Sequence, residues 1–376
     1  MEELWPSMDL IADMFLERVE EGHRESVQAE RLRPRMVRHF TGLPGFGGSR
    51  MAHNADRLLN RFWRYPSWLR KRAADFDVFH LVDHSYAQLV HELPAGRTVV
   101  TCHDLETFRC LVDSGSRRRG SWVHRSMARR TLSGLQRAVR VTCDSQATRN
   151  ELITYGLVAA DRVRVVANGV NPACSPHPDA AADLEAERLL GPAGTAPEVL
   201  NVGSTVPRKR VDVLLRAFGE VRRRVPDARL IRVGGPFTPG QSVLAGQAGL
   251  ADSVRVLPFV SRAVLSAVYR RAAVVAQPSE YEGFGLPIVE AMACGSVVLA
   301  SDIPVFREVG GTAVCRCPVG DVPAWSRALV ELMDERRDSP AGWQQRRAAG
   351  LARAAEFSWE AYAAKMVALY REVLAL

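Results

Sequence analysis

The sequence predicts an α/β protein of two domains, each built on a parallel, doubly wound sheet. Apolar runs of strand length alternate with helical periodicities over residues 76–167, and the alternation resumes over residues 199–317. Between the two series, residues 172–197 are rich in Pro, Ala, Asp and Gly, a composition typical of a linker. The length of 376 residues suits two domains of ordinary size. We therefore expect a first domain with its linker over residues 1–190, a second domain over 191–356 and a closing helix over 357–376.

The chain before residue 73 is predicted to be mostly helical. Apolar residues recur at helical spacing over residues 1–20, and a second helix is expected over residues 52–72. Residues 26–40 contain a weak strand candidate. The glycine-rich run 42–48 predicts a surface loop rather than a phosphate cradle, because no buried strand precedes it.

The regular β-α alternation begins after this helical part. The helix over residues 145–155 has an N-cap in Asp144 or Ser145, and the strand before residue 168 ends in the turn signal Asn168-Gly169. The predicted strands of the first series cover residues 76–82, 97–102, 139–143 and 162–167, and its helices cover 86–92, 122–138 and 145–155. The predicted strands of the second series cover residues 199–202, 230–233, 254–257, 272–276, 297–300 and 314–317. Its helices cover residues 211–224, 262–271, 286–293, 322–336, 341–356 and 358–375.

Composition places the chain among soluble globular proteins, with 47% hydrophobic and 24% charged residues. No apolar run reaches membrane-spanning length, and no signal peptide opens the chain. The seven cysteines are odd in number and scattered without a CxxC pair, which favours reduced thiols and no structural zinc. We therefore expect a cytoplasmic protein.

The net charge of +8 suits anionic partners, which include nucleotide phosphates, an anionic membrane surface and nucleic acid. Arginine-rich solvated helix faces explain most of this charge, and no aromatic-interleaved nucleic-acid motif appears. Residues 65–72, with Phe62 and Trp63 before them, mix aromatics and arginines as a membrane interface does. A helix packed inside the first domain is the favoured explanation, and peripheral contact with the inner face of a membrane stays open.

A strand, a glycine loop and a short helix follow one another before residue 294. The loop Gly283-Phe-Gly285 brings backbone N–H groups close to a ligand, and Leu286-Pro287 opens the helix because proline is tolerated at its start. Anionic ligands bind where the C-terminal end of a parallel strand faces a helix N-terminus. Glu282 lies in the loop and Glu290 is expected in the first helical turn, where carboxylates take up sugar hydroxyls. Taken singly, Glu290 would only complement the helix dipole and Glu282 would be solvated.

The whole string from Gln277 to Ser301 resembles the donor-binding signature of the retaining glycosyltransferases of family 4, the glycosyl transferases group 1. In that signature two glutamates, separated by seven residues, surround a Gly-Phe-Gly-Leu-Pro core. Here they are Glu282 and Glu290, and Glu290 opens the string Glu-Ala-Met-Ala-Cys-Gly. The resemblance covers residues 77–376. It implies the GT-B fold, in which two Rossmann-like domains face a central cleft and the last helix crosses back to the first domain.

The first strand of the second domain is followed by Gly203 and, in the same loop, by adjacent Arg208 and Lys209. A guanidinium fork beside an ammonium suits a diphosphate, although a solvated basic turn would be the favoured explanation without the resemblance. The family has an Arg-Lys pair here on the donor diphosphate. Many members also carry an arginine directly after the glycine, where this chain has Ser204, so one family charge is absent.

Three further residues gain a role from the resemblance. His103 ends the strand over residues 97–102, where it could bond the donor sugar or a neighbouring carbonyl, and where a structural histidine is an equal explanation. The family often has a histidine near the reacting centre at this place. Phe259 and Val260 follow the third strand of the second domain, where the family reads the nucleobase through backbone groups, but Pro258 stands where glycine is usual.

The resemblance thus implies a hexosyltransferase without cofactor, acting with retention in glycan, glycolipid or glycosylated natural-product biosynthesis. We expect it to be metal-independent because no metal-ligating cluster is visible in the sequence. The donor would be a UDP- or GDP-sugar, and the acceptor a sugar, lipid-linked or small-molecule hydroxyl bound by the first domain. The implied catalytic residues are Glu282, Arg208, Lys209 and His103. The implied donor-binding residues are Glu290, Gly283, Phe284, Gly285, Leu286, Phe259, Val260 and Gly203.

Two alternatives stay open. One is an inactive GT-B scaffold that binds membrane or nucleic acid, against which the intact Glu282, Glu290, Arg208 and Lys209 argue. The other is another GT-B enzyme, such as a sugar-nucleotide epimerase or a glycan phosphorylase, which the Gly-Phe-Gly-Leu-Pro string disfavours.

One departure from the family concerns the start of the chain. Family members begin with a buried strand and a glycine-rich loop before the first helix, whereas this chain opens on the helix itself. A missing central strand would leave backbone groups of the sheet unpaired. We therefore expect either that the first strand lies upstream or that the first domain is organised unusually.

Overall fold

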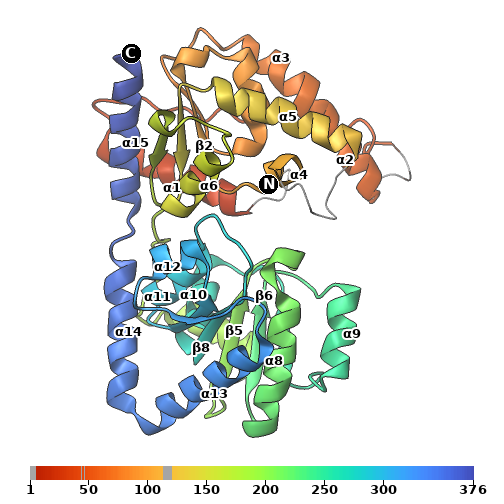
Figure 1. The fold of residues 1–376 in the computed structure, drawn as a ribbon, viewed down its shortest axis with the longest axis vertical. Coiled ribbons are helices and arrows are strands. Elements are labelled where there is room, and N and C mark those ends of the chain that lie inside the picture. The colour runs from red at the N-terminus through yellow and green to blue at the C-terminus, as the bar shows by residue number, and fades with distance from the viewer. Residues whose placement is uncertain (1–5, 44, 46, 113–120) are drawn as a thin grey trace. The chain divides into compact units, whose positions relative to one another are not determined.

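The computed structural model describes residues 6–43, 45, 47–112 and 121–376, and these fall into two compact units (Figure 1). Unit 1 holds residues 1–168 and 359–376, and unit 2 holds the continuous stretch 169–358. Each unit contains one parallel sheet with helices packed on it, so the α/β class expected from the alternating apolar runs is confirmed.

Unit 1 is organised around a four-stranded parallel sheet in the order β1-β2-β3-β4. Each strand lies beside the strand that precedes it, so the chain crosses this sheet in a single direction. Val99, Val100 and Val141 at its centre are fully buried. The strands are β1 (Phe79–Leu81), β2 (Thr98–Cys102), β3 (Arg140–Cys143) and β4 (Val163–Val165).

The helices of unit 1 include two from opposite ends of the chain, α1 and α15, which pack together. Ile11 and Met14 of α1 lie in one apolar cluster with Tyr362 and Met366 of α15. The α-helices of unit 1 are α1 (Pro6–Gly22), α2 (Arg50–Leu59), α3 (Tyr65–Arg70), α4 (Arg109–Val112), α5 (Trp122–Arg137), α6 (Gln146–Thr154) and α15 (Trp359–Leu374). Short 3-10 helices cover His84–Glu92, Ala95–Arg97, Glu106–Phe108 and Ala160–Arg162.

One expectation for the early chain was wrong. Residues 26–40 form no strand; instead, the backbone at residues 37–40 is bound by Asp56 of α2 and by Asn60. The helix expected over residues 52–72 is present, with a π-helical turn, Asn60–Arg64, between α2 and α3. Tyr65 and Leu69 of α3 are buried in an apolar cluster, which favours the packed-helix explanation for residues 65–72.

The polarity of α2 is the reverse of that of an ordinary surface helix. Its buried face carries polar Asp56 beside Ala52 and continues into Asn60, the first residue of the π-helical turn. Its opposite face exposes Met51, whose exposed fraction is 82%, together with Leu58. The helix is therefore held in place by hydrogen bonds, while its apolar side chains face solvent.

The polar face of α2 binds the strap of chain over residues 37–41. Asp56 accepts the N–H groups of His39, Phe40 and Thr41 at 2.8–2.9 Å. Asn60 accepts the N–H of Val37 at 2.9 Å and donates to its carbonyl at 2.8 Å. Burial opposes ionisation of Asp56, but these hydrogen bonds outweigh it and lower the pKa of this carboxyl.

Unit 2 is organised around a six-stranded parallel sheet in the order β10-β9-β8-β5-β6-β7. The chain builds β5 to β7 toward one edge and then returns to build β8 to β10 toward the other, as in a doubly wound sheet. The direction of strand order therefore switches between β5 and β8. The strands are β5 (Glu198–Val202), β6 (Arg229–Val233), β7 (Val254–Leu257), β8 (Val274–Gln277), β9 (Val297–Ser301) and β10 (Cys315–Cys317).

The helices of unit 2 pack on this sheet around a core that includes Val199, Phe218 and Trp325. Three of them, α7, α9 and α12, lie where no helix was expected. The helices are α7 (Ala180–Leu190), α8 (Val211–Arg224), α9 (Pro239–Gln247), α10 (Arg262–Arg271), α11 (Leu286–Ala293), α12 (Pro304–Gly310), α13 (Val322–Asp338) and α14 (Pro340–Ala354).

The stretch predicted as a linker, residues 172–197, instead contains α7. Asp179 caps this helix by accepting the N–H groups of Ala181 and Ala182. The helix packs against α10, and Asp183 pairs with Arg270. Because these contacts lie inside unit 2, the division between the units comes after residue 168 rather than after residue 190.

Candidate functional site

Polar side chains tie together the C-terminal ends of β5 and β8, where the strand order of unit 2 switches. Asn201 of β5 donates to the carbonyl of Ala276 at 2.8 Å, and Gln277 of β8 donates back to the carbonyl of Val202 at 3.0 Å. This place in a doubly wound sheet is where ligands bind. The two loops that leave it, after Val202 and after Gln277, contain most of the site residues predicted from the sequence.

Glu282 joins these two loops through two cations. Its carboxylate accepts Arg208 at 2.9 Å, contacts the ammonium of Lys209, and accepts the Ser279 hydroxyl at 2.7 Å. Arg208 also donates to the carbonyl of Tyr281 at 3.1 Å. The structure therefore brings together three predicted residues, Glu282, Arg208 and Lys209, in one cluster with an excess of positive charge.

The carboxylate of Glu282 is ionised and held in place. Its side chain is only 8% exposed, and burial by itself would raise its pKa. The charges of Lys209 and Arg208 outweigh burial and lower the pKa of Glu282 to about 2. In this state Glu282 can only accept hydrogen bonds, which suits sugar hydroxyls.

The loop after Glu282 leads into α11 through a glycine that its surroundings require. Gly285 has φ +91°, a conformation that disfavours other residues, and a Cβ at this position would lie 2.6 Å from the ring of Phe306. Leu286 and Pro287 then open the helix, so its N-terminal N–H groups point toward the loop. This end of α11 offers backbone donors and a positive dipole to an anion.

Glu290 lies in the second turn of α11, not in the first turn as expected, so it cannot complement the helix dipole. It is buried and accepts Arg262 and the hydroxyl of Tyr269, both from α10 and both at 3.1 Å. Burial raises the pKa of Glu290, and the two donors counteract this. Each carboxylate oxygen can accept a second hydrogen bond, so a ribose diol would share Glu290 with α10.

The remaining predicted donor-binding residues offer backbone rather than side chains, with one exception. Phe284 is buried and packs its ring edge-on against Phe357, with centroids 5.5 Å apart. Gly203 packs tightly against Gly234, where a Cβ would lie 2.2 Å from the carbonyl oxygen of Gly203. Phe259 is the exception, because its ring is exposed after β7. Val260 follows it in the same loop and is half-buried.

Arg232 of β6 is a residue of this site that the sequence analysis missed. Its side chain is fully buried, donates to the carbonyl of Gly203 at 2.7 Å and bonds the side chain of Asn201. Burial lowers its pKa to about 10, which leaves it charged at neutral pH. The available signal was an arginine inside an otherwise apolar strand, directly before Val233 and the Gly234-Gly235 pair.

His103 belongs to unit 1, and both of its ring nitrogens are in use there. One lies 2.7 Å from the carboxylate of Asp144, and the other lies 2.6 Å from the carbonyl of Val82. Burial opposes protonation of His103, but Asp144 outweighs it and raises its pKa to about 9. Of the two roles considered, bonding the donor sugar or a neighbouring carbonyl, these contacts support the second.

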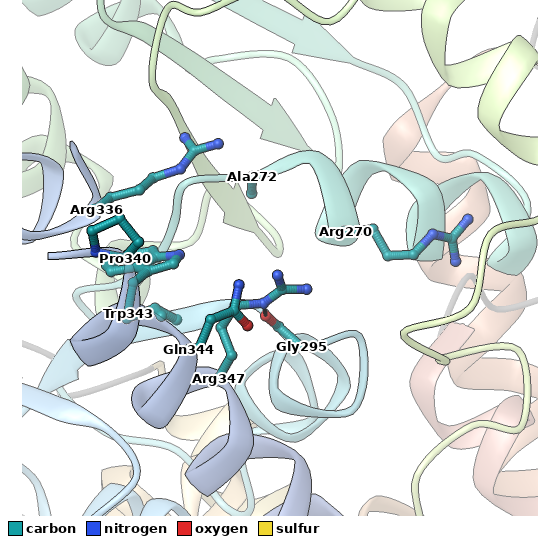
Figure 2. Close-up of a pocket in the computed structure, with 9 residues that line it drawn as sticks. Arg270, Ala272, Gly295, Arg336, Pro340, Trp343, Gln344 and Arg347 are labelled. Carbon is teal, nitrogen blue, oxygen red and sulfur yellow. Dashed lines mark hydrogen bonds between the residues drawn. The ribbon is translucent and has the colours of Figure 1, made fainter.

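A separate pocket of about 280 Å³ lies at the amino-terminal ends of β8 and β9 in unit 2, away from the carboxyl ends where the cluster lies (Figure 2). It is bordered by Ala272 before β8, by Gly295 before β9 and by residues of α13 and α14, among them Arg336 and Trp343. None of the predicted site residues lines it. Among the described residues no group of three or more His, Cys, Asp or Glu is placed to hold a metal ion.

Comparisons with known proteins cover nearly the whole chain. Residues 18–173 match the family described as Glycosyltransferase Family 4, and residues 185–348 match the glycosyl transferases group 1. The D-inositol 3-phosphate glycosyltransferase of Segniliparus rotundus is 34% identical over 245 residues, which are 62% of this chain and 52% of that protein. The chain spans about half the length of the curated relatives it matches.

Solved structures share the fold. The sucrose-phosphate synthase of Thermosynechococcus elongatus has a TM-score of 0.68 at 24% identity, covering 83% of this chain and 78% of that one. HepE of Anabaena, solved with UDP-glucose, has a TM-score of 0.66 at 18% identity, covering 84% and 83%. These likenesses and the two parallel sheets confirm the GT-B class expected for the fold.

Proposed function

The chain belongs to glycosyltransferase family 4, the glycosyl transferases group 1, and we propose that it is a retaining hexosyltransferase. It moves a sugar from a UDP- or GDP-sugar to an acceptor hydroxyl, in the synthesis of a glycan, a glycolipid or a glycosylated natural product. The observation that carries this proposal is the cluster of Glu282, Arg208 and Lys209 at the switch point of unit 2. HepE, which shares the fold, was solved with UDP-glucose, in keeping with a nucleotide-sugar donor.

In the proposed reaction, the bond between the anomeric carbon and the leaving phosphate oxygen breaks. A bond from the acceptor oxygen forms on the same face of the sugar, and the acceptor proton passes to the leaving phosphate. Arg208 and Lys209 stabilise the negative charge that grows on the diphosphate, which is the main electrostatic task of the step. Glu282 holds sugar hydroxyls, Glu290 holds the ribose, and the N-terminus of α11 orients the phosphates.

The test is release of nucleoside diphosphate from a panel of UDP-, GDP- and ADP-sugars, with and without candidate acceptors. We expect one donor to be hydrolysed or transferred by the wild type and by Lys71→Ala, a matched control in unit 1. Lys209→Ala should lose this activity. Equal activity of Lys209→Ala and wild type would overturn the assignment of the site, and conversion of the donor without an acceptor into an isomeric sugar nucleotide would favour an epimerase.

Metal independence and a cytoplasmic location are parts of the same proposal. Positive side chains can take over the charge-neutralising role of a metal at a diphosphate. Turnover should therefore be unchanged in excess chelator, and its loss, restored by a divalent cation, would contradict this. Asp75 and Asp77 form an Asp-x-Asp pair before β1, outside the cluster described above.

The exposed face of α2 supports a peripheral location on an anionic membrane. Residues 31–72 contain eleven Lys and Arg side chains and one carboxylate, the buried Asp56, so this segment carries +10 while the remaining 39 basic and 41 acidic residues carry −2. A straight α-helix would place Trp63 on the buried face of α2, eleven residues after Ala52. The π turn adds about one residue to the helical path and turns Trp63 outward, where its exposed fraction is 65%.

Exposed Met51, Leu58 and Trp63 beside this positive charge fit a bilayer with anionic headgroups. No helix among the described residues is long and apolar enough to cross such a bilayer. We expect the chain to sediment with phosphatidylglycerol vesicles but not with phosphatidylcholine vesicles. Met51→Glu and Trp63→Glu should each weaken binding about tenfold.

The matched control is Val243→Glu on α9 of unit 2, where the side chain is 60% exposed. It makes the same change in charge away from α2 and should leave vesicle binding within about twofold of wild type. Equal binding of wild type and both α2 variants would contradict the membrane face. Binding of single-stranded RNA that is as tight as vesicle binding, and that is the same in the wild type and in both α2 variants, would favour the nucleic-acid alternative.

A further inference from the structure

Arg232 is a buried cation without an ionic partner. No carboxylate among the described residues pairs with it, and its Nε is buried without a hydrogen-bond partner. Its neighbours along β6, Leu230, Ile231 and Val233, are the buried apolar residues expected in a central strand. Burying a charge without a counter-charge is unfavourable by several kcal/mol as an order of magnitude, and two neutral acceptors offset only part of this.

The contact of Arg232 with Gly203 sets the direction of a peptide group. The guanidinium donates to the carbonyl of Gly203 at 2.7 Å. In a trans peptide the N–H of the next residue, Ser204, points away from that carbonyl. Ser204 is exposed, and its N–H makes no hydrogen bond within the described part of the chain. The peptide is thus held by its oxygen, while its donor is left for a ligand.

The same loop leads on to the cations of the predicted diphosphate site. Lys209 lies against Gly203, with its side-chain carbons 3.7–3.9 Å from where a Cβ of that glycine would be. Arg232 and Lys209 therefore both contact Gly203, Arg232 at its carbonyl and Lys209 at its α-carbon. An anion at this loop would receive the Ser204 N–H, with Arg232 on the other side of the peptide group that donates it.

We infer that Arg232 is a positioning residue of the donor diphosphate site, which aims the Ser204 N–H at a phosphate oxygen and polarises the peptide group that donates it. The inference rests on the proposed nucleotide-sugar function. It differs from a purely structural role of Arg232 in one respect. A structural role makes all ligands of unit 2 bind more weakly, whereas this role affects ligands in proportion to their phosphate groups.

The experiment is calorimetric titration of the full chain with uridine, UMP and UDP, and with the guanosine series. For the base that binds, Arg232→Met should weaken the diphosphate about tenfold or more and the nucleoside less than about twofold, because the Ser204 N–H that Arg232 orients donates to phosphate only. Arg229→Met is the matched control, since Arg229 lies at the other end of the same strand and pairs with Glu198. It should leave all three affinities within about twofold of wild type.

A relocated charge provides a second, independent variant. Ser204→Arg in the Arg232→Met background places a guanidinium at the exposed position next to Gly203, and it should restore most of the lost diphosphate affinity. Equal weakening of nucleoside, monophosphate and diphosphate, or no weakening at all, would overturn the inference while leaving the proposed function intact. A wild type that binds neither UDP nor GDP would overturn both.

Discussion

Both units place charged side chains at the carboxyl ends of their strands, but most of these side chains are negative in unit 1 and positive in unit 2. At the carboxyl ends of β1, β2 and β3, unit 1 has three aspartates, Asp83, Asp104 and Asp144, around the protonated His103. Around the carboxyl ends of β5, β6 and β8, unit 2 has the cations Arg208, Lys209 and Arg232, and the first two share the carboxylate of Glu282. Topology thus decides where polar groups gather, and residue type decides what they can bind.

The two clusters also differ in whether each charge meets a partner of opposite charge within the protein. In unit 1 the charge of His103 is met by Asp144, and its other nitrogen is met by a carbonyl. In unit 2 one carboxylate is shared by Arg208 and Lys209, and Arg232 has no carboxylate partner among the described residues. We expect changes in the first cluster to act on stability and changes in the second to act on ligands.

The largest expected effect is on turnover, from Glu282→Gln. The amide keeps the shape of the side chain but replaces a charged, acceptor-only carboxylate by a neutral group that also donates, so both cations lose their counter-charge and sugar hydroxyls lose an acceptor. We expect kcat to fall about a hundredfold, and the unfolding midpoint to fall as well because two ion pairs are lost. A matched change at an exposed glutamate, Glu185→Gln on α7, should leave kcat unaltered, and a fall of less than threefold in Glu282→Gln would remove the glutamate from the catalytic set.

The corresponding change in unit 1, Asp144→Asn, should act on stability instead. It leaves the buried His103 without its counter-charge, which costs about 3 kcal/mol. Hydrogen exchange would locate the loss in the amides of β2 and β3, while β5 and β8 stay protected. Equal loss of protection in both sheets would mean that the two clusters are not independent.

Gly285→Ala should have a smaller effect, on both stability and ligand binding. The positive φ and the contact with Phe306 make a Cβ unfavourable by about 1–3 kcal/mol, and relief of this strain would move the start of α11. We expect the affinity for the nucleoside diphosphate to fall a few times, and the affinity for the nucleoside to fall less, because the N-terminus of α11 orients the phosphates. Gly240→Ala on α9, where a Cβ has open space, is the control, and equal effects of the two substitutions would contradict this account.

The effects of pH should have opposite signs in the two units. The pKa of Glu282 is lowered from 4.5 to about 2, so its contribution to stability is present above pH 4.5 and is lost as the pH falls toward 2. The pKa of His103 is raised from 6.5 to about 9, so its contribution is present below pH 6.5 and is lost as the pH rises through 9. Hydrogen exchange across this range should show β8 losing protection at low pH and β2 losing protection at high pH. The same pH profile for both strands would contradict these two assignments.

Sequence reasoning predicted the strand ends and the residues that cluster at the switch point, because a strand, a glycine loop and a helix start leave local signals. It failed where a long-range partner decides the role. Arg232 was missed because a single charge inside an apolar strand gives no indication that Gly203 and Asn201 will accept it. Both nitrogens of His103 are satisfied by groups that lie at least 21 residues away in the chain, which no local pattern reveals.

The missed helix α7 has a different cause. Its own residues favour a helix, since Ala, Leu and Glu dominate residues 180–190 and Asp179 is a good cap. The proline and glycine on either side dominated the composition of the wider stretch. The boundary between the units was therefore predicted after residue 190 instead of after residue 168, because α7 packs on α10 and brings the preceding residues into unit 2.

The packing of α1 against α15 has a consequence for biosynthesis. Translation proceeds from the amino terminus, so a ribosome makes α1 before unit 2 and makes α15 after it. Unit 2, which is continuous, therefore has all of its residues available before unit 1 does. The nascent chain must keep Ile11 and Met14 uncovered by Tyr362 and Met366 until α15 has emerged, so unit 1 is completed only after unit 2 has been made.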